Sequence, residues 1–448
     1  MSNLNRRQFL QSTVAAAGAA MIVPASALGR TGRPAPSDRI TLAFIGTGNM
    51  AMNHVLSFLR DERVQIVAVC DVNEGSGGYW NGGLAGRQPA QRLVNFHYGR
   101  EIRSGAFSAC DTYGDFRDVI GRDDVDAVVI GTPDHWHAIP AVRAADSGKD
   151  IYCEKPLSLT VAEGRAMSDA AAANNVIFQV GSQQRSDERF RHACELVRNG
   201  RLGRVHTVRV GLPPGRPDLG MTGHRKAPEP VPEGFDYDMW LGPRPEAPYA
   251  PARCHVNFRW IYDYSGGQVT DWGGHHPDIA QWGLGTVETG PVAIRNAKGV
   301  FPEDELWNTA TEFHFEAVYA DDTVMIVSDK ERMGVTFEGN DGWIWVTRGD
   351  HEVSDDAIWN SEIGEDDIRL HHSENHQDDF INSILSRSQP VAPVEHGHRS
   401  ITICHLGNIA MRLGRDLRWD PESEQIIGDD SASEMLSREM REPWSLEG

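Results

Sequence analysis

Apolar and polar residues alternate with two different periods along the first part of the chain, and this pattern predicts an α/β fold. Arg39 to Ala51 begins with an apolar run, passes two glycines and continues with apolar residues at helical spacing, as expected for a strand, a turn and a helix. Gln65 to Cys70 is a second apolar run of strand length. Further strands are predicted at 126–131, 150–153 and 176–180, and helices at 113–120, 138–147 and 161–174. Such repeated strand–helix units predict a doubly wound parallel sheet over residues 39–182.

The pattern changes after Gly181 to longer loops and alternating strands, which predicts a second domain over residues 183–448. Strands are predicted at 205–210, 309–319, 323–328, 334–337 and 343–347, and helices at 375–385 and 400–413. This is an α+β domain with a large, mainly antiparallel open sheet. One face of strand 309–319 carries Phe313, Phe315, Ala317 and Tyr319, which we expect helices or a partner subunit to cover.

The turn after the first strand has the spacing of a dinucleotide-binding turn. Gly46 allows a tight turn, Gly48 lets a pyrophosphate approach the backbone, and Ala51 lets the helix pack closely on the strand. Asp71 follows 25 residues after Gly46. A carboxylate at this position accepts hydrogen bonds from a ribose diol and repels a 2′-phosphate. The pattern predicts a Rossmann domain that prefers NAD to NADP, and the alternative is an ordinary strand–turn–helix unit. The predicted cofactor residues of this region are Gly46, Thr47, Gly48, Asn49, Met50 and Asp71.

Composition narrows the classes of partner. The 448 residues suffice for two buried cores. A formal charge of −21 argues against nucleic acid or an anionic membrane surface as a partner; the small-molecule substrate is expected from the motifs described below. The six cysteines form no Cys-x-x-Cys pair and no zinc-like spacing, so neither a disulfide framework nor a metal cluster is indicated. Buried free thiols are expected instead.

The N-terminus has the pattern of a targeting segment. A twin-arginine motif at 5–10 precedes an apolar run at 14–23 and small residues at 25–27 that fit a cleavage site. We expect a twin-arginine signal peptide over 1–29 and a linker over 30–38, with export to the periplasm or the extracellular space. The run is short for a membrane-spanning helix, so no membrane contact is expected after signal removal. An uncleaved N-terminal anchor is the alternative.

Polar motifs follow the predicted strands at their carboxyl ends, where ligands bind in such folds. Strand 126–131 runs into Thr132-Pro133-Asp134-His135-Trp136-His137, and strand 150–153 runs into Glu154-Lys155-Pro156. The second domain contains Asp271-Trp-Gly-Gly-His275. Together with the glycine turn, these motifs resemble those of the Gfo/Idh/MocA oxidoreductases, from about Arg39 to about Leu413.

The resemblance implies a two-domain oxidoreductase that acts on sugars or polyols with NAD or NADP. It implies a catalytic set of Lys155, Asp271 and His275. It adds Thr132, Pro133, His137, Glu154 and Lys155 to the cofactor-binding residues. Family members commonly associate through the open face of the second sheet, which implies a homo-oligomer, a dimer or a tetramer.

The residues themselves support such chemistry. Hydride transfer from a carbinol needs a base for the hydroxyl proton and a cation for the developing alkoxide. Asp271 and His275 are four residues apart at the start of an expected helix, hence on one face, so the carboxylate is expected to orient the imidazole. Lys155, at a strand end, is expected to stabilise the alkoxide or relay its proton.

Two further sets of polar residues leave alternatives open. Arg185, His255, Arg259 and His276 are candidates for binding a polar substrate, although a structural role is as good an explanation for each. The pairs His135 with His137 and His275 with His276 allow a metal site in principle, but a nicotinamide fold explains such histidines without a metal.

Three functions are compatible with these observations. The first is an NAD-dependent oxidoreductase acting on a sugar, polyol or sugar derivative. The second is an NAD-dependent glycoside hydrolase or lyase that oxidises the sugar transiently, like glycoside hydrolase family 109; that branch usually lacks the aspartate found here at 271. The third is a non-catalytic binding protein, which the filled catalytic positions disfavour. Because export conflicts with a freely exchanging cofactor, we also expect tight NAD retention, helped by 74–86 and the linker.

Overall fold

The computed structural model of the protein describes residues 38–101, 109–215, 218–303 and 306–447. The chain from Ile40 to Gly448 forms one unit, and Met1–Arg39 is a separate one. The predicted signal peptide and residues 30–37 of the predicted linker lie outside the described residues. Within the described ranges, no helix has the length and apolar character needed to cross a membrane.

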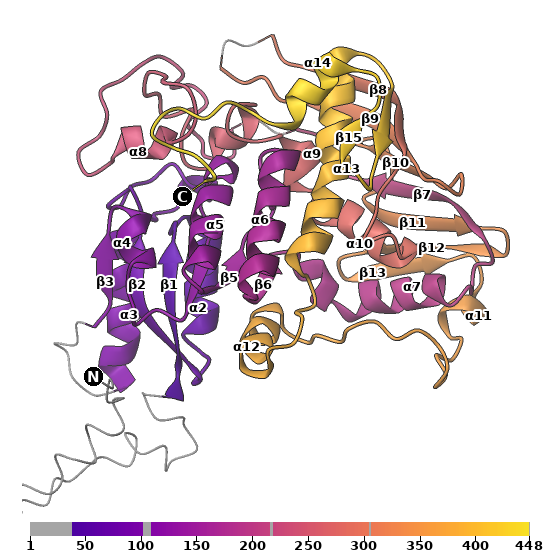
Figure 1. The fold of residues 1–448 in the computed structure, drawn as a ribbon, viewed down its shortest axis with the longest axis horizontal. Coiled ribbons are helices and arrows are strands. Elements are labelled where there is room, and N and C mark those ends of the chain that lie inside the picture. Colours follow the sequence, from indigo (N-terminus) through magenta and orange to yellow (C-terminus); the bar gives the residue numbers. More distant parts are fainter. Residues whose placement is uncertain (1–37, 102–108, 216–217, 304–305, 448) are drawn as a thin grey trace, which may run out of the picture. The chain divides into compact units, whose positions relative to one another are not determined.

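A six-stranded parallel sheet forms the first half of this unit, which confirms the predicted fold class (Figure 1). Its order, β3-β2-β1-β4-β5-β6, is that of a Rossmann domain. The strands are β1 (Ile40–Ile45), β2 (Val64–Cys70), β3 (Asp111–Tyr113), β4 (Ala127–Ile130), β5 (Asp150–Cys153) and β6 (Phe178–Val180). The helices are α2 (Asn49–Phe58), α3 (Arg87–Glu101), α4 (Phe116–Ile120), α5 (Ala138–Asp146) and α6 (Val161–Asn174). Because β1 pairs with both β2 and β4, its carboxyl end lies at the point where the strand order reverses, and this is where ligands bind.

Local capping explains which helix boundaries are predictable. Helix α6 begins after Thr160, whose hydroxyl accepts a hydrogen bond from the Glu163 amide, and ends at Asn175, which has a φ of 50°. It therefore occupies the predicted range. The predicted helix at 113–120 is wrong at its start, because Tyr113 ends β3. The helix begins only after Asp115, whose side chain caps the Arg117 amide.

The second half is built on a nine-stranded sheet of order β13-β12-β11-β7-β10-β9-β8-β14-β15. Strands β7 and β10 pair parallel, and the other neighbours pair antiparallel. The strands are β7 (Val205–Gly211), β8 (Ala293–Val300), β9 (Glu312–Val318), β10 (Val324–Ser328), β11 (Gly334–Gly339), β12 (Gly342–Thr347), β13 (Asp350–Val353), β14 (Leu417–Asp420) and β15 (Gln425–Ile426). The α-helices are α7 (Glu188–Arg198), α8 (Tyr237–Leu241), α9 (Gln268–Asp271), α10 (His276–Leu284), α11 (Asp356–Trp359), α12 (His376–Ser386), α13 (Val394–Leu413) and α14 (Asp430–Ser433).

Helices α7, α10 and α13 cover one face of this sheet. The aromatic face of β9 is part of that covered surface. Phe315 packs so closely on α13 that a Cβ at Gly407 would lie 2.5 Å from its ring. The apolar face that the sequence assigns to helices or a partner subunit is thus buried by the chain's own helices.

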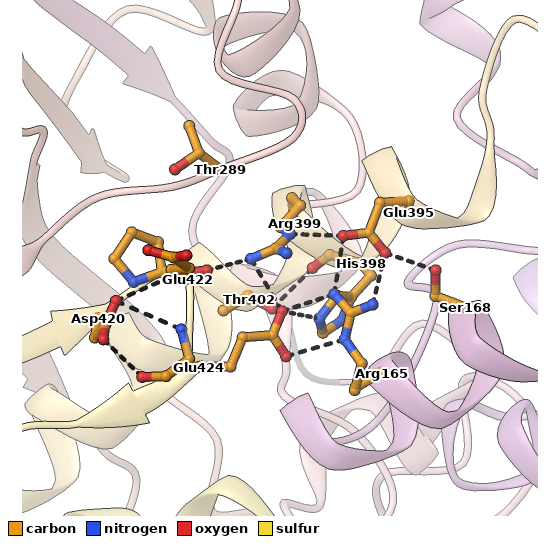
Figure 2. Close-up of polar contacts among 12 residues, drawn as sticks. Arg165, Ser168, Thr289, Glu395, His398, Arg399, Thr402, Asp420, Glu422 and Glu424 are labelled. Carbon is orange, nitrogen blue, oxygen red and sulfur yellow. Dashed lines mark hydrogen bonds and ion pairs between the residues drawn. The ribbon is translucent and has the colours of Figure 1, made fainter.

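Helix α13 also contacts α6, and an ion-pair network joins the two halves there (Figure 2). The Arg165 guanidinium of α6 lies 2.8 Å from a Glu395 oxygen of α13 and 2.8 Å from Glu424, beside β15. Arg399 also bonds to Glu395, at 2.7 Å, and His398 bonds to Glu424, at 2.8 Å. Ion pairs therefore join helix α6 of the Rossmann domain to α13 and to the residue before β15 in the second half.

Candidate active site

The turn between β1 and α2 leaves backbone groups of its glycines uncapped by side chains. Gly46 has a φ of 82°, and a Cβ there would lie 2.7 Å from the Thr132 nitrogen. A side chain at this position would push the turn away from the end of β4. Gly48 is the N-cap of α2, and no side chain caps this helix start. The first turn of α2 is thus suited to a ligand phosphate.

Asp71 lies beside this turn, just after β2. One of its carboxyl oxygens accepts hydrogen bonds from the Thr47 amide at 2.7 Å and the Thr47 hydroxyl at 3.1 Å, and the other accepts from the Asn73 amide at 2.8 Å. Burial raises the pKa of Asp71, and these hydrogen bonds offset the shift in part. Thr47 is fully buried and holds Asp71 in place.

The residues that follow β4 and β5 lie at the same edge of the sheet. Thr132 has a buried hydroxyl without a hydrogen-bond partner among the described residues. Glu154 accepts a hydrogen bond from the His54 ring, with Nε2 and Oε1 2.6 Å apart. Burial alone would raise the pKa of Glu154, but the hydrogen bond and charge of His54 lower it overall.

Lys155, Asp271 and Arg259 form an ion triad that is largely shielded from solvent. The Lys155 Nζ lies 3.0 Å from Asp271 Oδ1 and 3.0 Å from the Asp271 carbonyl oxygen. The Arg259 Nε lies 3.1 Å from the same Oδ1. Burial raises the pKa of Asp271, but the charges of Lys155 and Arg259 outweigh it and hold this pKa below its ordinary range. The carboxylate therefore stays ionised and orients both cations.

The expectation that Asp271 and His275 share one helical face is wrong. Asp271 is the last residue of α9, and His275 is the N-cap of α10. Between them the backbone passes close to Lys155, where a Cβ at Gly274 would lie 2.9 Å from the Lys155 Cβ. The chain leaves its helical path here, so the carboxylate faces the two cations.

His275 is buried close to this triad. Its Nδ1 has no hydrogen-bond partner within the described part of the chain. Burial, with a further contribution from the charge of Lys155, lowers the pKa of His275 well below 6.5. The imidazole is therefore uncharged near pH 7, which leaves one ring nitrogen as a hydrogen-bond acceptor.

A cavity of about 430 Å³ extends along the sheet edge from the glycine turn to Lys155. This volume lies in the range of small-molecule sites. The predicted site residues that line it are Gly46, Gly48, Asn49, Met50, Asp71, Thr132, Pro133, Glu154, Lys155, His255 and Arg259. The predicted residues that do not line it are Thr47, His137, Arg185, Asp271, His275 and His276.

Three of these histidine and arginine residues have partners that explain them structurally. Arg185 forms a buried, two-point ion pair with Asp278, with both distances 2.7 Å. His276 lies 2.8 Å from the Gly211 carbonyl through its Nδ1. His137 bridges the two strand ends through the carbonyl oxygens of Pro156 and Thr132, at 2.8 and 3.0 Å. Among the described residues, no cluster of His, Cys, Asp or Glu is arranged to hold a metal.

Aromatic residues from both halves complete the cavity, and the sequence analysis did not assign them to the site. Tyr79 lies over Gly48, and its ring centroid is 4.5 Å from that of His255. Trp136 and Trp240 come from different halves, both line the cavity, and the Trp136 Nε1 donates to the Trp240 carbonyl at 3.0 Å. The glycine-rich composition of 74–86 predicts a loop. Its contacts with 234–257 in the structure show that this loop lies at the edge of the cavity.

Comparison with known proteins defines the class. A model described as "Oxidoreductase family, C-terminal alpha/beta domain" matches residues 189–446, and one described as "Oxidoreductase family, NAD-binding Rossmann fold" matches 85–182. The first match alone spans more than half of the chain. The chain therefore belongs to the Gfo/Idh/MocA oxidoreductase family and contains an NAD-binding Rossmann domain.

Similar proteins connect this family to sugars. The chain is 36% identical to an uncharacterized oxidoreductase of Streptococcus pneumoniae over 105 residues, which are 23% of this chain and 29% of that protein. It is 29% identical to a glycosyl hydrolase family 109 protein of Shewanella baltica over 232 residues, 47% of this chain and 44% of that protein. Each match spans less than half of the relative. The structure of scyllo-inositol dehydrogenase from Lactobacillus casei, solved with NAD(H) and scyllo-inositol, shares the fold with a TM-score of 0.57 and 18% identity over 85% of this chain and 99% of that one.

Proposed function

We propose that the protein is an NAD-dependent oxidoreductase that acts on a hydroxyl-bearing carbon of a sugar, polyol or sugar derivative. The observation that carries the proposal is the Lys155–Asp271–Arg259 triad, which holds a lysine ammonium in the same cavity as the glycine turn. The residues present fit a dinucleotide. The turn leaves no room for a Cβ at Gly46, the start of α2 is uncapped, and Asp71 lines the cavity.

The chain's own groups can manage the proton and the charge of the reaction. When bound, the nicotinamide supplies the hydride acceptor or donor. Two of the three Lys155 ammonium hydrogens reach Asp271 oxygens, which leaves one for the substrate hydroxyl. This ammonium stabilises the oxygen as negative charge develops on it. His275 is the candidate acceptor for the hydroxyl proton by its match to the family motif; its Nδ1 has no hydrogen-bond partner among the described residues, but the side chain does not line the cavity.

Substitution of Lys155 tests this assignment. Lys155→Met should keep NAD binding within a few-fold and reduce turnover by at least about 10²-fold, because loss of one charge-stabilising donor has an effect of this size. Lys330→Met is a matched control, since the Lys330 side chain is 67% exposed. Turnover of Lys155→Met at the level of the control would refute the proposal.

A second candidate is an NAD-dependent glycoside hydrolase or lyase. The match to the family 109 protein over 232 residues favours it. Lys155 and His275 would serve the same transient oxidation, but the product would be free sugar without net NADH. Release of a free sugar from a glycoside, with no NADH accumulating, would establish this activity in place of net oxidation.

We also propose that the chain is exported by the twin-arginine route with its cofactor already bound. The twin-arginine motif and small-residue cleavage site in residues 1–29 support this. Fractionation of cells that express the full-length chain should find the processed protein in the periplasm, and substitution of both Arg6 and Arg7 by lysine should retain the protein in the cytoplasm. An unchanged distribution would contradict export by this route.

A further inference from the structure

The C-terminal segment 438–447 returns from the second domain to the Rossmann domain. In Figure 1 it is the yellow coil that leaves α14 and passes back toward α4 and α5. The segment contains Trp444, which is buried with 8% exposure. Burial of such a large aromatic side chain against the Rossmann domain indicates a specific contact.

Trp444 packs behind one wall of the cofactor cavity. Its ring centroid lies 4.8 Å from that of Trp136 and 6.2 Å from that of Phe116. Both Trp136 and Phe116 line the cavity. The Arg117 guanidinium covers the outer side of Trp444, 5.1 Å from the ring. Trp444 therefore supports two cavity residues of the Rossmann domain without entering the cavity.

Arg441, three residues earlier, holds the wall on the other side. Its guanidinium donates to the Gly242 carbonyl at 2.9 Å and to the Asp238 carboxylate at 2.6 Å, and its amide donates to the Pro243 carbonyl at 3.0 Å. These groups lie in and just after α8, whose Met239 lines the cavity. Arg441 thus fixes the position of α8.

The two walls also contact each other directly. The Trp136 Nε1 donates to the Met239 carbonyl at 3.0 Å. Gly242 passes so close that a Cβ there would lie 2.1 Å from the Trp136 ring. Segment 438–447 contacts both partners, through the Arg441 hydrogen bonds to 238–243 and the ring contact between Trp444 and Trp136.

The opposite side of the cavity is closed by a second contact between the halves. The Glu74 amide donates to the Gly234 carbonyl at 2.8 Å, and Asn73 and Phe235 form an antiparallel bridge. The Tyr79 and His255 rings then contact each other at the cavity edge, with an angle of 40° between their planes. Loop 73–80 and segment 234–255 together form this contact.

We propose that segment 438–447 is a strap that retains the dinucleotide through repeated turnovers, with Trp444 and Arg441 as positioning residues. This rests on the proposed function, because it assigns the cavity to NAD. Arg441 and Trp444 act through α8 and Trp136, so their loss should raise the rate of cofactor dissociation more than it disturbs the chemistry. Burial of an aromatic side chain of this size corresponds to roughly 10²-fold in an equilibrium constant.

The test measures dissociation of NADH from the loaded full-length protein, chased with excess unlabelled NAD. Trp444→Ala is expected to raise the dissociation rate by at least about 10²-fold and Arg441→Ala by about tenfold or more. Trp444→Phe should restore most of the retention. Trp343→Ala is the matched control, because this tryptophan is 37% exposed on β12.

Cofactor-free protein distinguishes a strap from a general structural role. Val335→Ala, in the core on β11, is the comparison variant for loss of stability. The thermal midpoint of the cofactor-free protein should fall in both Trp444→Ala and Val335→Ala. Only Trp444→Ala should also release NADH faster. Should Trp444→Ala not fold, Arg441→Ala and Trp444→Phe carry the comparison. Dissociation rates within twofold of wild type in the folded variants would overturn the strap alone. A wild-type protein that binds no NAD(H) would overturn both the strap and the proposed function.

Discussion

Asp271 is the residue whose replacement most sharply separates the observed site from the expected one. Asp271→Asn removes a charge while keeping the shape of the side chain. In the structure that charge faces Lys155 at 3.0 Å and Arg259 at 3.1 Å, and the Asp271 side chain is only 9% exposed. The substitution leaves two partly buried cations without their shared carboxylate.

The expected effect follows from these distances. At an effective dielectric constant of about 20, unit charges 3.0 Å apart attract each other by about 5–6 kcal/mol. Relief from desolvating the carboxylate offsets part of this. Removal of one partner from a buried ion pair typically lowers stability by about 3–5 kcal/mol. We expect a loss of about that size in the free energy of unfolding, and a fall in turnover of about 10²-fold because Lys155 keeps only its backbone acceptor.

A double-mutant cycle in urea unfolding is the assay. Asp271→Asn combined with Lys155→Met should show a coupling energy of about 1–3 kcal/mol, as expected for groups in direct contact. Asp271→Asn combined with His275→Gln should show a smaller coupling energy than the Lys155 pair, because the charge of Asp271 acts on His275 without a hydrogen bond between the two side chains. Strong coupling to His275 with none to Lys155 would refute the triad and restore the expected carboxylate–imidazole pair.

Three further predictions concern the cofactor turn, cofactor choice and acid stability. Gly46→Ala should lower the free energy of unfolding and weaken NAD binding at least tenfold in a titration. Gly349 has the same φ of 82° but open space around it, so Gly349→Ala should lower the free energy of unfolding by only about 1 kcal/mol. Equal effects of the two substitutions would contradict the backbone clash at Gly46. Asp71→Ser should raise the ratio of NADP to NAD affinity at least tenfold by equilibrium binding, and an unchanged ratio would contradict the assigned ribose contact. Burial raises the pKa values of Glu395 and Glu424. Hydrogen bonds outweigh this effect, chiefly the bond from Arg165 to Glu395 and the bond from His398 to Glu424, and both pKa values fall to about 2. Both pKa values lie below the unfolded value of about 4.3, so the stability that the two carboxylates contribute is complete above that pH. It should be lost as the pH falls from about 4.5 to 2. In acid-unfolding curves, Glu395→Gln should show a smaller loss of stability over this range.

The fold could be predicted from the sequence because its first half repeats one unit. Buried parallel strands read as continuous apolar runs, and helix α6 has a capping threonine at one end and Asn175 at the other. Helix α3 escaped prediction. It offers a narrow stripe of Ala90, Val94 and Tyr98 to the core on an otherwise polar sequence. So few apolar residues do not distinguish this helix from a continuation of the glycine-rich loop that precedes it.

The site could be predicted only where topology alone sets position. Thr132, Glu154 and Lys155 follow parallel strands, so they had to meet at one edge of the sheet. The partner of Asp271 depended on how α9 approaches β5, which sequence spacing does not encode. Trp444 lies more than 300 residues from its partner Trp136, and no local pattern signals such a contact.

The most direct test of the central claim follows a labelled hydrogen. The loaded protein is mixed with a panel of sugars and polyols that carry deuterium on the reacting carbon, and the extracted cofactor is examined by mass spectrometry. Deuterium should appear on the nicotinamide with wild-type protein and Lys330→Met, and Lys155→Met should transfer it at least about 10²-fold more slowly. Turnover of any of these substrates without deuterium reaching the cofactor, or equal transfer by Lys155→Met, would contradict hydride transfer assisted by Lys155.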